Sequence, residues 1–425
     1  MINQASLDTV AAGRLDQHFI RPNYDTYGFA QIPNTVHSLL TGAPYVGVPF
    51  GQRQDLVDQY DAVILLFVDS FGWRFFEQYA DRAPFLQRIV RNGLATKLTS
   101  QFPSTTAVHV PTIHSGLPLS QHGVCEWFHY EPQLDALIAP LLFSFAGDDK
   151  RDTLVPTGIS PTELFPNPSF YQRLADAGVP SFVLHNSKIA HSSFSKWATR
   201  AATIVPYSTL PSAFTTLAQL VGRATQPTYY FLYWEAIDST CHQFGPDSPQ
   251  AQAEIELFLL AMEHILHPQL ARQPGRTLLL LTADHGHTAV DPTTTVYLNH
   301  TLPEITRFLK TSRAGKLLVP AGSPRDMFLH IAEGQVEAAH ALLSQHLAGK
   351  ADVRRVDDLL AQGFFGPLPA SDQLLGRIGD LVILPYLGET VWWYEKDRFD
   401  LHHLGMHGGL SPHEMETLLL ALPYG

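Results

Sequence analysis

The chain has 425 residues, more than one small hydrophobic core requires, so we expect one large domain and a smaller second one. Hydrophobic residues make up 45% and charged residues 16%, a composition typical of a globular protein rather than of a disordered or membrane-spanning one. The formal net charge of -12 argues against a protein that binds nucleic acid by neutralising many phosphates. It is compatible with an enzyme whose bound cations invert the local field.

The two cysteines, Cys125 and Cys241, indicate no disulfide framework. The first residues lack the cationic start and apolar core of a signal peptide. No apolar run approaches the roughly 20 residues that a membrane helix requires. We therefore expect a cytoplasmic protein that has no membrane partner.

Short apolar segments recur along the chain, and polar turns bound each of them. Runs of this length, rich in Val, Ile, Leu and aromatic residues, are typical of buried strands in a mostly parallel sheet. Amphipathic stretches between them, at residues 73–91, 162–176 and 252–267, predict helices. The alternation predicts an α/β fold of three layers, with helices on both faces of the sheet. The apolar segments are residues 62–68, 181–184, 229–234, 277–281, 381–384 and 417–422.

The segment 292–396 has a different pattern, which predicts a small α+β insert. We expect an α/β core formed by residues 1–291 and 397–425, with the insert either capping the functional site or serving only a structural purpose. Stretches rich in Pro and Gly interrupt the insert region at residues 320–324 and 366–369. Its predicted elements are a strand at 326–331, helices at 335–348 and 355–362, and a strand at 380–385.

Three predicted strands end in carboxylates, at the edge of the sheet where α/β proteins bind ligands. Asp69 follows the first strand, and Asp284-His285 follows the strand near residue 280. Asp238-x-x-x-His242 follows the strand near residue 230, and its two side chains share one face of a helical turn. A buried carboxylate is costly unless it is paired or binds a cation, so Asp284-His285 favours a metal site.

Neighbouring residues admit other interpretations. Cys241 is a possible third ligand beside Asp238 and His242, but a small buried core thiol is the favoured interpretation.

His407 lies among glycines, in Gly405-Met406-His407-Gly408-Gly409, where the backbone can approach a ligand closely. A turn histidine without a ligand is the alternative.

The segment Phe102-Pro103-Ser104-Thr105-Thr106 precedes a predicted helix and supplies a candidate nucleophile, Thr106. A hydroxyl attacks poorly at neutral pH unless a base or a metal activates it. A helix start would add amide donors for a phosphoryl oxygen. Ordinary helix capping by Ser104 or Thr105 is the alternative, and it does not exclude attack by the next residue.

In this order, the Asp after the first strand, FPSTT, DxxxH, DHG and the late HGG resemble the alkaline phosphatase superfamily, most closely its nucleotide pyrophosphatase/phosphodiesterase branch. The resemblance spans about residues 61–423 and implies an alkaline phosphatase-like core with a small inserted subdomain. It also implies two divalent metal ions, usually zinc, with manganese as a substitute. By position, Asp238, His242 and His407 would bind one metal, and Asp69, Asp284 and His285 the other, which Thr106 would touch as nucleophile.

One position departs from the family pattern. Many members have an aromatic residue, a proline and then an asparagine after the nucleophile, whereas this chain has Ala107, Val108 and His109. The asparagine helps to hold a phosphoryl oxygen, so His109 either replaces it in binding the substrate or that contact is lost.

These features predict a phosphoester hydrolase that works by in-line displacement, with Thr106 carrying a covalent phosphoryl group. A diester or nucleotide substrate is favoured, because no third ligand cluster marks a monoesterase. Arg325 and Arg377 could reach the substrate, although structural roles are favoured for them. The expected partner is a small phosphodiester or nucleotide rather than a nucleic-acid scaffold, and the oligomeric state is open. The alternatives are a phosphomonoesterase or phosphomutase of the same superfamily, and a non-catalytic metal-binding sensor.

Overall fold

The computed structural model describes residues 1–165 and 169–425, and its largest element is a seven-stranded sheet in the order β2-β17-β9-β1-β8-β6-β7. The five strands from β9 to β7 run parallel to one another, whereas β17 is antiparallel to both β9 and β2. The mostly parallel sheet expected from the sequence is thus confirmed. The strands are β1 (Ala62–Val68), β2 (Leu94–Thr99), β6 (Ser181–Asn186), β7 (Thr203–Tyr207), β8 (Thr228–Trp234), β9 (Thr277–Thr282) and β17 (Glu416–Tyr424).

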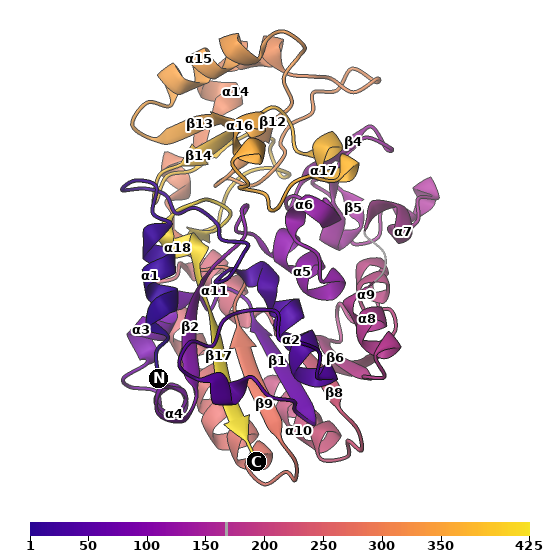
Figure 1. The fold of residues 1–425 in the computed structure, drawn as a ribbon. Coiled ribbons are helices and arrows are strands. Elements are labelled where there is room, and N and C mark those ends of the chain that lie inside the picture. Colours follow the sequence, from indigo (N-terminus) through magenta and orange to yellow (C-terminus); the bar gives the residue numbers. More distant parts are fainter. Residues whose placement is uncertain (166–168) are drawn as a thin grey trace.

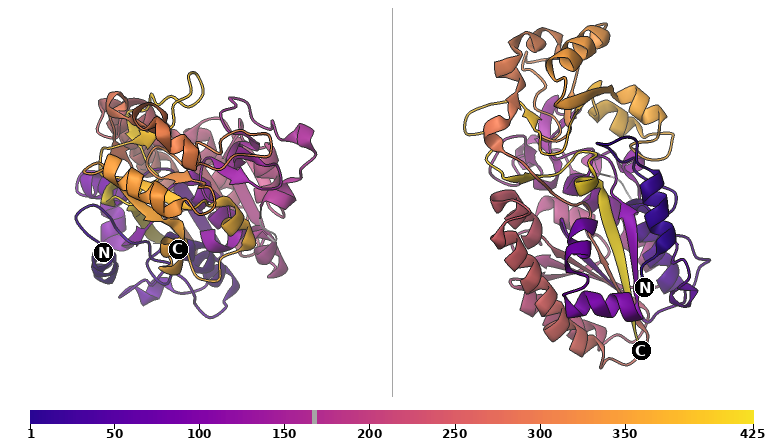
Figure 2. Two further views of the ribbon diagram at one scale, coloured as in Figure 1. Left: turned by 90° about the horizontal axis from the view of Figure 1, so that it is seen from above. Right: turned by 90° about the vertical axis from the view of Figure 1, so that its left-hand side faces the viewer.

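Both faces of this sheet are covered, as the burial of every residue of β1 requires. Ile64 and Leu66 point into one hydrophobic cluster, while Val63 and Leu65 point into another on the opposite face. Helices pack over both clusters, which gives the three expected layers (Figures 1 and 2). The first face carries α3 (Trp73–Tyr79), α4 (Pro84–Asn92), α10 (Leu210–Val221) and α12 (Pro249–Ala261), and the second carries α2 (Ile32–Thr41), α5 (Thr106–Ser115) and α8 (Phe170–Asp176).

The three predicted helical stretches are divided into shorter elements. The stretch 73–91 forms two helices, because Pro84 begins α4. The stretch 252–267 continues from α12 through a π-helical turn, Met262–Leu266, into α13 (His267–Leu270). Of the stretch 162–176, the structure describes α7 (Pro161–Leu164) and α8, and residues 166–168 lie outside the described part.

A second, smaller body lies above the carboxyl edge of the main sheet, at the top of Figure 1. We call residues 292–396 the cap, and these bounds remain a prediction. Its antiparallel sheet, β12-β14-β13, packs against α15 (Val336–His346) in a hydrophobic cluster of its own. The apolar segment 381–384 belongs to this sheet rather than to the main one. The strands are β12 (Met327–Leu329), β13 (Ala351–Arg355) and β14 (Leu381–Pro385). α16 (Val356–Ala361) packs on the face of this sheet opposite α15, toward the core.

Candidate metal centre

The three strands that carry predicted ligands are neighbours in the sheet, since β1 lies between β9 and β8. Asp69 directly follows β1, and Asp284 and His285 lie just beyond the end of β9. Asp238 and His242 lie on α11 (Ala236–Phe244), which begins immediately after β8. The parallel arrangement therefore brings these five side chains to one edge of the sheet.

His407 joins this group from the segment that returns from the cap. Its strand, β16 (Gly405–Met406), pairs with β10 (Thr288–Ala289), which follows the Asp284-His285 loop. The ring of His407 stacks on His285, with centroids 3.7 Å apart, and its Nε2 atom lies 3.2 Å from Nε2 of His242. All six predicted ligands thus converge, although only five of them come from the main strand ends.

The first ligand group consists of Asp69, Asp284 and His285, whose ligand atoms all lie within 4.8 Å of one another. Thr106 lies against this group. Its Oγ1 atom is 3.2 Å from Nε2 of His285 and 3.4 Å from a carboxylate oxygen of Asp69. The candidate nucleophile therefore faces the ligand group to which the sequence assigned it.

The second group consists of Asp238, His242 and His407. Nε2 of His242 and Nε2 of His407 lie 3.5 and 3.6 Å from the Asp238 carboxylate. Asp238 also forms a compact set with His285 and His407, so its carboxylate lies between the two groups. Two metal ions bound here would be close neighbours.

Each of these three histidines is oriented by the backbone. Nδ1 of His242 lies 2.8 Å from the carbonyl of Gly405, Nδ1 of His285 lies 3.0 Å from that of Gly286, and Nδ1 of His407 lies 3.1 Å from that of Ser104. In each ring the Nδ1 proton is donated to a carbonyl, which leaves the Nε2 lone pair directed at the centre. Burial lowers the pKa of all three rings, to about 4 for His242, so they are neutral, as metal ligands must be.

The carboxylates show the opposite shift. Burial, with repulsion between neighbouring carboxylates at Asp69 and Asp284, raises the pKa of Asp238 and Asp284 to about 7 and that of Asp69 well above its usual range. Within the described residues, every ion-pair partner of these three groups is a histidine. Oδ1 of Asp238 and Oδ2 of Asp284 are buried without a hydrogen-bond partner. Such a carboxylate cluster fits divalent cations, which would compensate the charge that no lysine or arginine balances.

One further histidine lies beside the centre, and the sequence analysis did not single it out. The ligand atoms of His287, Asp238 and His242 lie within 4.8 Å of one another. Nδ1 of His287 is 2.8 Å from the hydroxyl of Ser70, whose backbone N–H donates to Asp284, while its buried Nε2 has no hydrogen-bond partner. The available signal in the sequence was the position of His287, two residues after His285 and directly before β10.

The geometry does not give His109 the predicted role in substrate binding. Its Nδ1 donates to the carbonyl of Thr105, 2.7 Å away, and its Nε2 accepts the backbone N–H of Gln101 at 2.9 Å. The ring is fully buried, and both nitrogens are already engaged. His109 therefore holds the start of α5 in place, and it offers no free donor to a phosphoryl oxygen.

Arg325 and Arg377 are likewise occupied. Arg325 forms a bidentate ion pair with Glu414, and Arg377 contacts Glu131, with all four side chains buried. These pairs join the cap and its flanking residues to the core. Cys241 is buried in the core cluster, as the favoured interpretation expected.

Two cavities open on Thr106. The cap-side cavity, of about 370 Å³, lies between the core and the cap, whereas the core-side cavity, of about 260 Å³, lies over α9 (Ser193–Ala198) and β8. Thr106, Asp238 and Trp127 line both of them. A phosphorus atom placed against Thr106 therefore has space for a substituent on each side.

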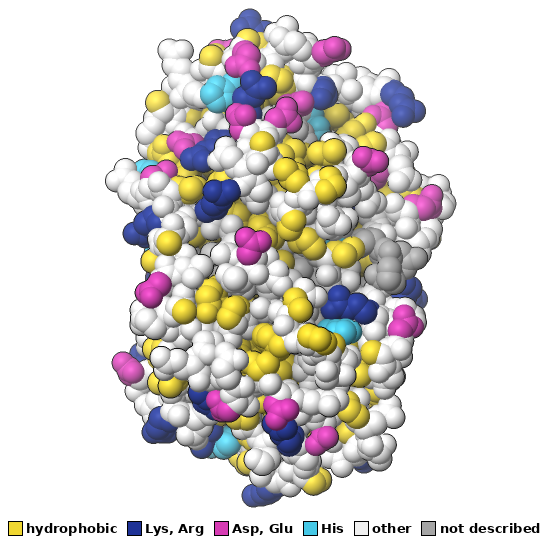
Figure 3. Space-filling view, in the orientation of Figure 1, with side chains coloured by type: hydrophobic (Ala, Val, Ile, Leu, Met, Phe, Trp, Pro, Cys, Tyr) yellow, Lys and Arg dark blue, Asp and Glu magenta, His cyan; other side chains and the backbone are white. Residues whose placement is uncertain are grey.

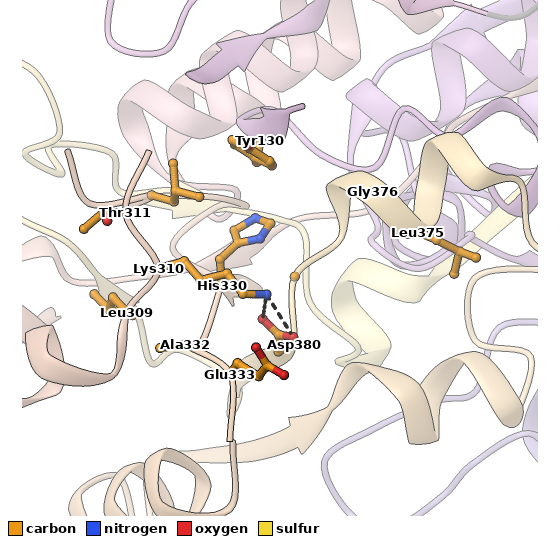
Figure 4. Close-up of a pocket in the computed structure, with 12 residues that line it drawn as sticks. Tyr130, Leu309, Lys310, Thr311, His330, Ala332, Glu333, Leu375, Gly376 and Asp380 are labelled. Carbon is orange, nitrogen blue, oxygen red and sulfur yellow. Dashed lines mark hydrogen bonds and ion pairs between the residues drawn. The ribbon is translucent and has the colours of Figure 1, made fainter. Parts of the chain in front are cut away.

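A cavity of about 480 Å³ lies elsewhere, between the cap, including its α17 (Asp372–Arg377), and β3 (His129–Glu131). Figure 4 shows His330 beside Tyr130, and Lys310 paired with Asp380 at 3.0 Å. Its lining includes none of the residues of the metal centre. We therefore assign the chemistry to the cavities at Thr106.

The α/β fold and the paired carboxylate and histidine groups define a metallohydrolase with a hydroxyl at its centre. Residues 63–410 match the model of the family described as type I phosphodiesterase / nucleotide pyrophosphatase, and the chain belongs to this family. The recognition made from the sequence motifs is thus confirmed. Ectonucleotide pyrophosphatase/phosphodiesterase family member 3 of Rattus norvegicus is 25% identical over 274 residues, which are 63% of this chain and 29% of that protein.

Solved structures show the same fold. Murine ectonucleotide pyrophosphatase / phosphodiesterase 5 superposes with a TM-score of 0.62 at 18% identity, over 85% of this chain and 87% of that one. Phosphonoacetate hydrolase from Sinorhizobium meliloti, in complex with phosphonoacetate, gives a TM-score of 0.60 at 18% identity, over 84% of this chain and 89% of that one. At this level of identity the likeness establishes the fold alone.

The surface carries charges of both signs. On the face seen in Figure 3, Lys and Arg side chains alternate with Asp and Glu rather than forming one basic field. Across the described ranges, no helix has the length and the apolar character needed to cross a membrane.

Proposed function

We propose that the protein is a two-metal phosphodiesterase or nucleotide pyrophosphatase in which Thr106 is the nucleophile and transiently carries the phosphoryl group. The observation that carries this proposal is the position of the Thr106 hydroxyl, 3.2 Å from His285 and 3.4 Å from Asp69, with the Asp238, His242 and His407 group alongside. Zinc is the metal that a mixed set of histidines and carboxylates favours, and manganese can replace it.

The residues around Thr106 have separate roles in this proposal. Thr106 is the first residue of α5. The N–H groups of Val108 and His109 donate to the Thr105 carbonyl, so those of Thr106 and Ala107 would serve an anionic phosphoryl oxygen. Tyr233 donates a hydrogen bond to Asp69 and fixes the orientation of its carboxylate. Two bound metals would polarise the phosphoryl group, lower the pKa of the attacking hydroxyl or water, and stabilise the leaving oxygen.

Two features support a diester rather than a monoester. A diester has two substituents on phosphorus, and two cavities open on Thr106. Arg325 and Arg377 are held in buried ion pairs and do not add positive charge for a dianionic monoester. A neighbouring structure, an inactive threonine-to-alanine variant of the murine protein, contains AMP, which supports a nucleotide-type substrate and a threonine nucleophile here.

The experiment compares turnover of bis(p-nitrophenyl) phosphate and p-nitrophenyl phosphate by the zinc-loaded protein and by the same protein after chelation. We expect diester hydrolysis that requires zinc and exceeds monoester hydrolysis in kcat/KM. A clear preference for the monoester would instead identify a phosphomonoesterase. Stoichiometric zinc binding without turnover of either compound would identify a metal-binding sensor.

A further inference from the structure

Trp127 lines both cavities at Thr106, together with Thr106 and Asp238. It follows the loop after α6 (Leu119–His122). Its relative exposure is 37%, although its neighbours Cys125 and Glu126 are buried. An indole that remains open beside a candidate nucleophile is available to a ligand.

The cap-side cavity has an aromatic wall. Phe128 stacks on Trp392 with centroids 6.4 Å apart, and it meets Phe399 edge-on at 5.6 Å. Trp392 and Phe399 are only 4% and 5% exposed, so they support the wall from behind. Trp127 is therefore the aromatic residue of this wall whose surface is most accessible to a ligand.

We infer that the cap-side cavity binds a planar aromatic substituent of the substrate phosphorus and that this ring stacks on Trp127. The inference rests on the proposed function, because it places the phosphorus against Thr106. Because Thr106 lines this cavity, a substituent of that phosphorus can extend from Thr106 into it. Stacking on an indole face favours a flat ring over a flexible alkyl chain.

Charges of both signs line the cap-side cavity. Arg398 lies over the ring of Phe399, 5.0 Å from its centroid, and pairs with Glu395 at 3.0 Å. Asp238 and Asp400 line the same cavity. These charges favour neither a cationic nor an anionic substituent, so the aromatic wall is the feature that selects a flat ring.

The test uses two probes that differ only in the ring, phenylphosphonate and methylphosphonate, titrated calorimetrically into the zinc-loaded protein. Both present the same phosphonate group to the metal centre. We expect the parent protein to bind phenylphosphonate at least about tenfold more tightly. Trp127→Ala should abolish this preference without changing the affinity for methylphosphonate, and Trp127→Phe should retain it.

The matched control is Trp393→Ala, which removes an indole next to Trp392 that does not line the cavity and should leave the preference intact. Leu401→Phe, which narrows only the cap-side cavity, should weaken phenylphosphonate binding selectively. A preference that survives Trp127→Ala, or one that is lost instead in Ile189→Phe of the core-side cavity, would overturn the inference. Failure of both probes to bind would overturn the proposed phosphoryl site itself, which methylphosphonate tests independently of the ring.

Discussion

The hydrogen bonds and protonation of individual ring nitrogens decide whether each histidine of the centre can bind a metal. In His242, His285 and His407 the Nδ1–H is donated to a backbone carbonyl, and the unprotonated Nε2 points inward. His287 has the reverse arrangement, with Nδ1 engaged by the side chain of Ser70 and Nε2 left without a partner. His287 also approaches Asp238 at 3.5 Å, and it thereby links the carboxylates of the two groups.

We expect His287→Met to weaken zinc binding at the Asp238 group by about 10- to 100-fold, the range typical of residues that orient metal ligands. The reason is that Asp238 would lose its contact with the imidazole. Competition with a chromophoric chelator measures the two affinities separately. His191→Asn, a change at an exposed histidine, is the control. Unchanged zinc affinities of the His287→Met variant would show that the imidazole contributes packing alone and does not orient Asp238.

The sequence predicts the six side chains that converge at the centre, but not the hydrogen bonds that decide what each neighbouring residue can do. Asp69, Asp238 and Asp284 are recognisable because each follows a buried apolar strand. His109 could not be interpreted in the same way, because its role depends on the Gln101 and Thr105 backbone groups that surround it in three dimensions. His287 was missed because its approach to the centre depends on the short pairing of β10 with β16.

At the level of elements, the loop after β16 holds His407 in place against the start of α5. Ser104 donates its backbone N–H to the carbonyl of Gly408 and its hydroxyl to that of Gly409. Gly408 has φ of 128°, and a Cβ there would lie 2.5 Å from the Ser323 hydroxyl and 2.7 Å from Asp326. This loop thus requires a glycine for conformation and for space.

Gly408→Ala should lower the free energy of unfolding by about 1–3 kcal/mol and reduce the zinc content, because the loop must shift together with His407. Urea denaturation and metal analysis measure the two effects. Gly334→Ala is a matched control, since Gly334 also has a positive φ of 74° but nothing within 4 Å of an added Cβ. Equal losses of stability and equal zinc content in both variants would contradict the role assigned to the Gly408 contacts.

The elements themselves could be predicted to different extents. Segments such as 62–68 and 278–281 are strands because every residue is apolar and is buried in a sheet covered on both faces. β7 escaped notice because it is an edge strand whose residues are mostly exposed or half-buried. The pairing of 381–384 with the cap sheet instead of the main sheet is a tertiary property that local composition does not encode.

At the level of the whole molecule, buried polar contacts fasten the cap region to the core. Arg325 meets Glu414 of α18 (Pro412–Met415) through two hydrogen bonds of 2.9 and 2.7 Å. Nearby, Glu126 and Asp326 lie in contact, both fully buried. Ser323 and Pro324, next to these contacts, line the cap-side cavity together with core residues such as Thr106, so the cavity depends on the docking of the two bodies.

Glu414→Gln should lower the free energy of unfolding by about 3–5 kcal/mol, because Arg325 would remain buried without its counter-charge. Glu337→Gln, which removes the partner of Arg355 on the surface, should cost less than about 1 kcal/mol. Chemical denaturation of both variants measures the difference. Similarly small losses of unfolding free energy in the two variants would mean that the Arg325–Glu414 ion pair contributes little to holding the cap on the core.

The contact between Glu126 and Asp326 makes stability depend on pH. Burial raises the pKa of Glu126 from 4.5 to about 8, so the folded parent retains a proton that the unfolded chain has released. Its stabilising contribution is complete below pH 4.5 and is lost as the pH rises to about 8. Glu126→Gln lacks this loss, so its unfolding free energy relative to the parent should rise by up to ~1.4 kcal/mol per pH unit across that window. Glu304→Gln, a change at an exposed glutamate, is the control variant. A difference between Glu126→Gln and the parent that does not vary with pH would contradict this assignment.

The most direct test of the central claim is turnover of bis(p-nitrophenyl) phosphate by Thr106→Ala at zinc content equal to that of the parent protein. Removing the hydroxyl leaves Asp69, Asp284 and His285 in place, so zinc should still bind while kcat falls by at least about three orders of magnitude. Thr106→Ser, which retains a hydroxyl, should recover part of the rate. A Thr106→Ala protein that binds zinc and turns over the diester at the parent rate would contradict the account.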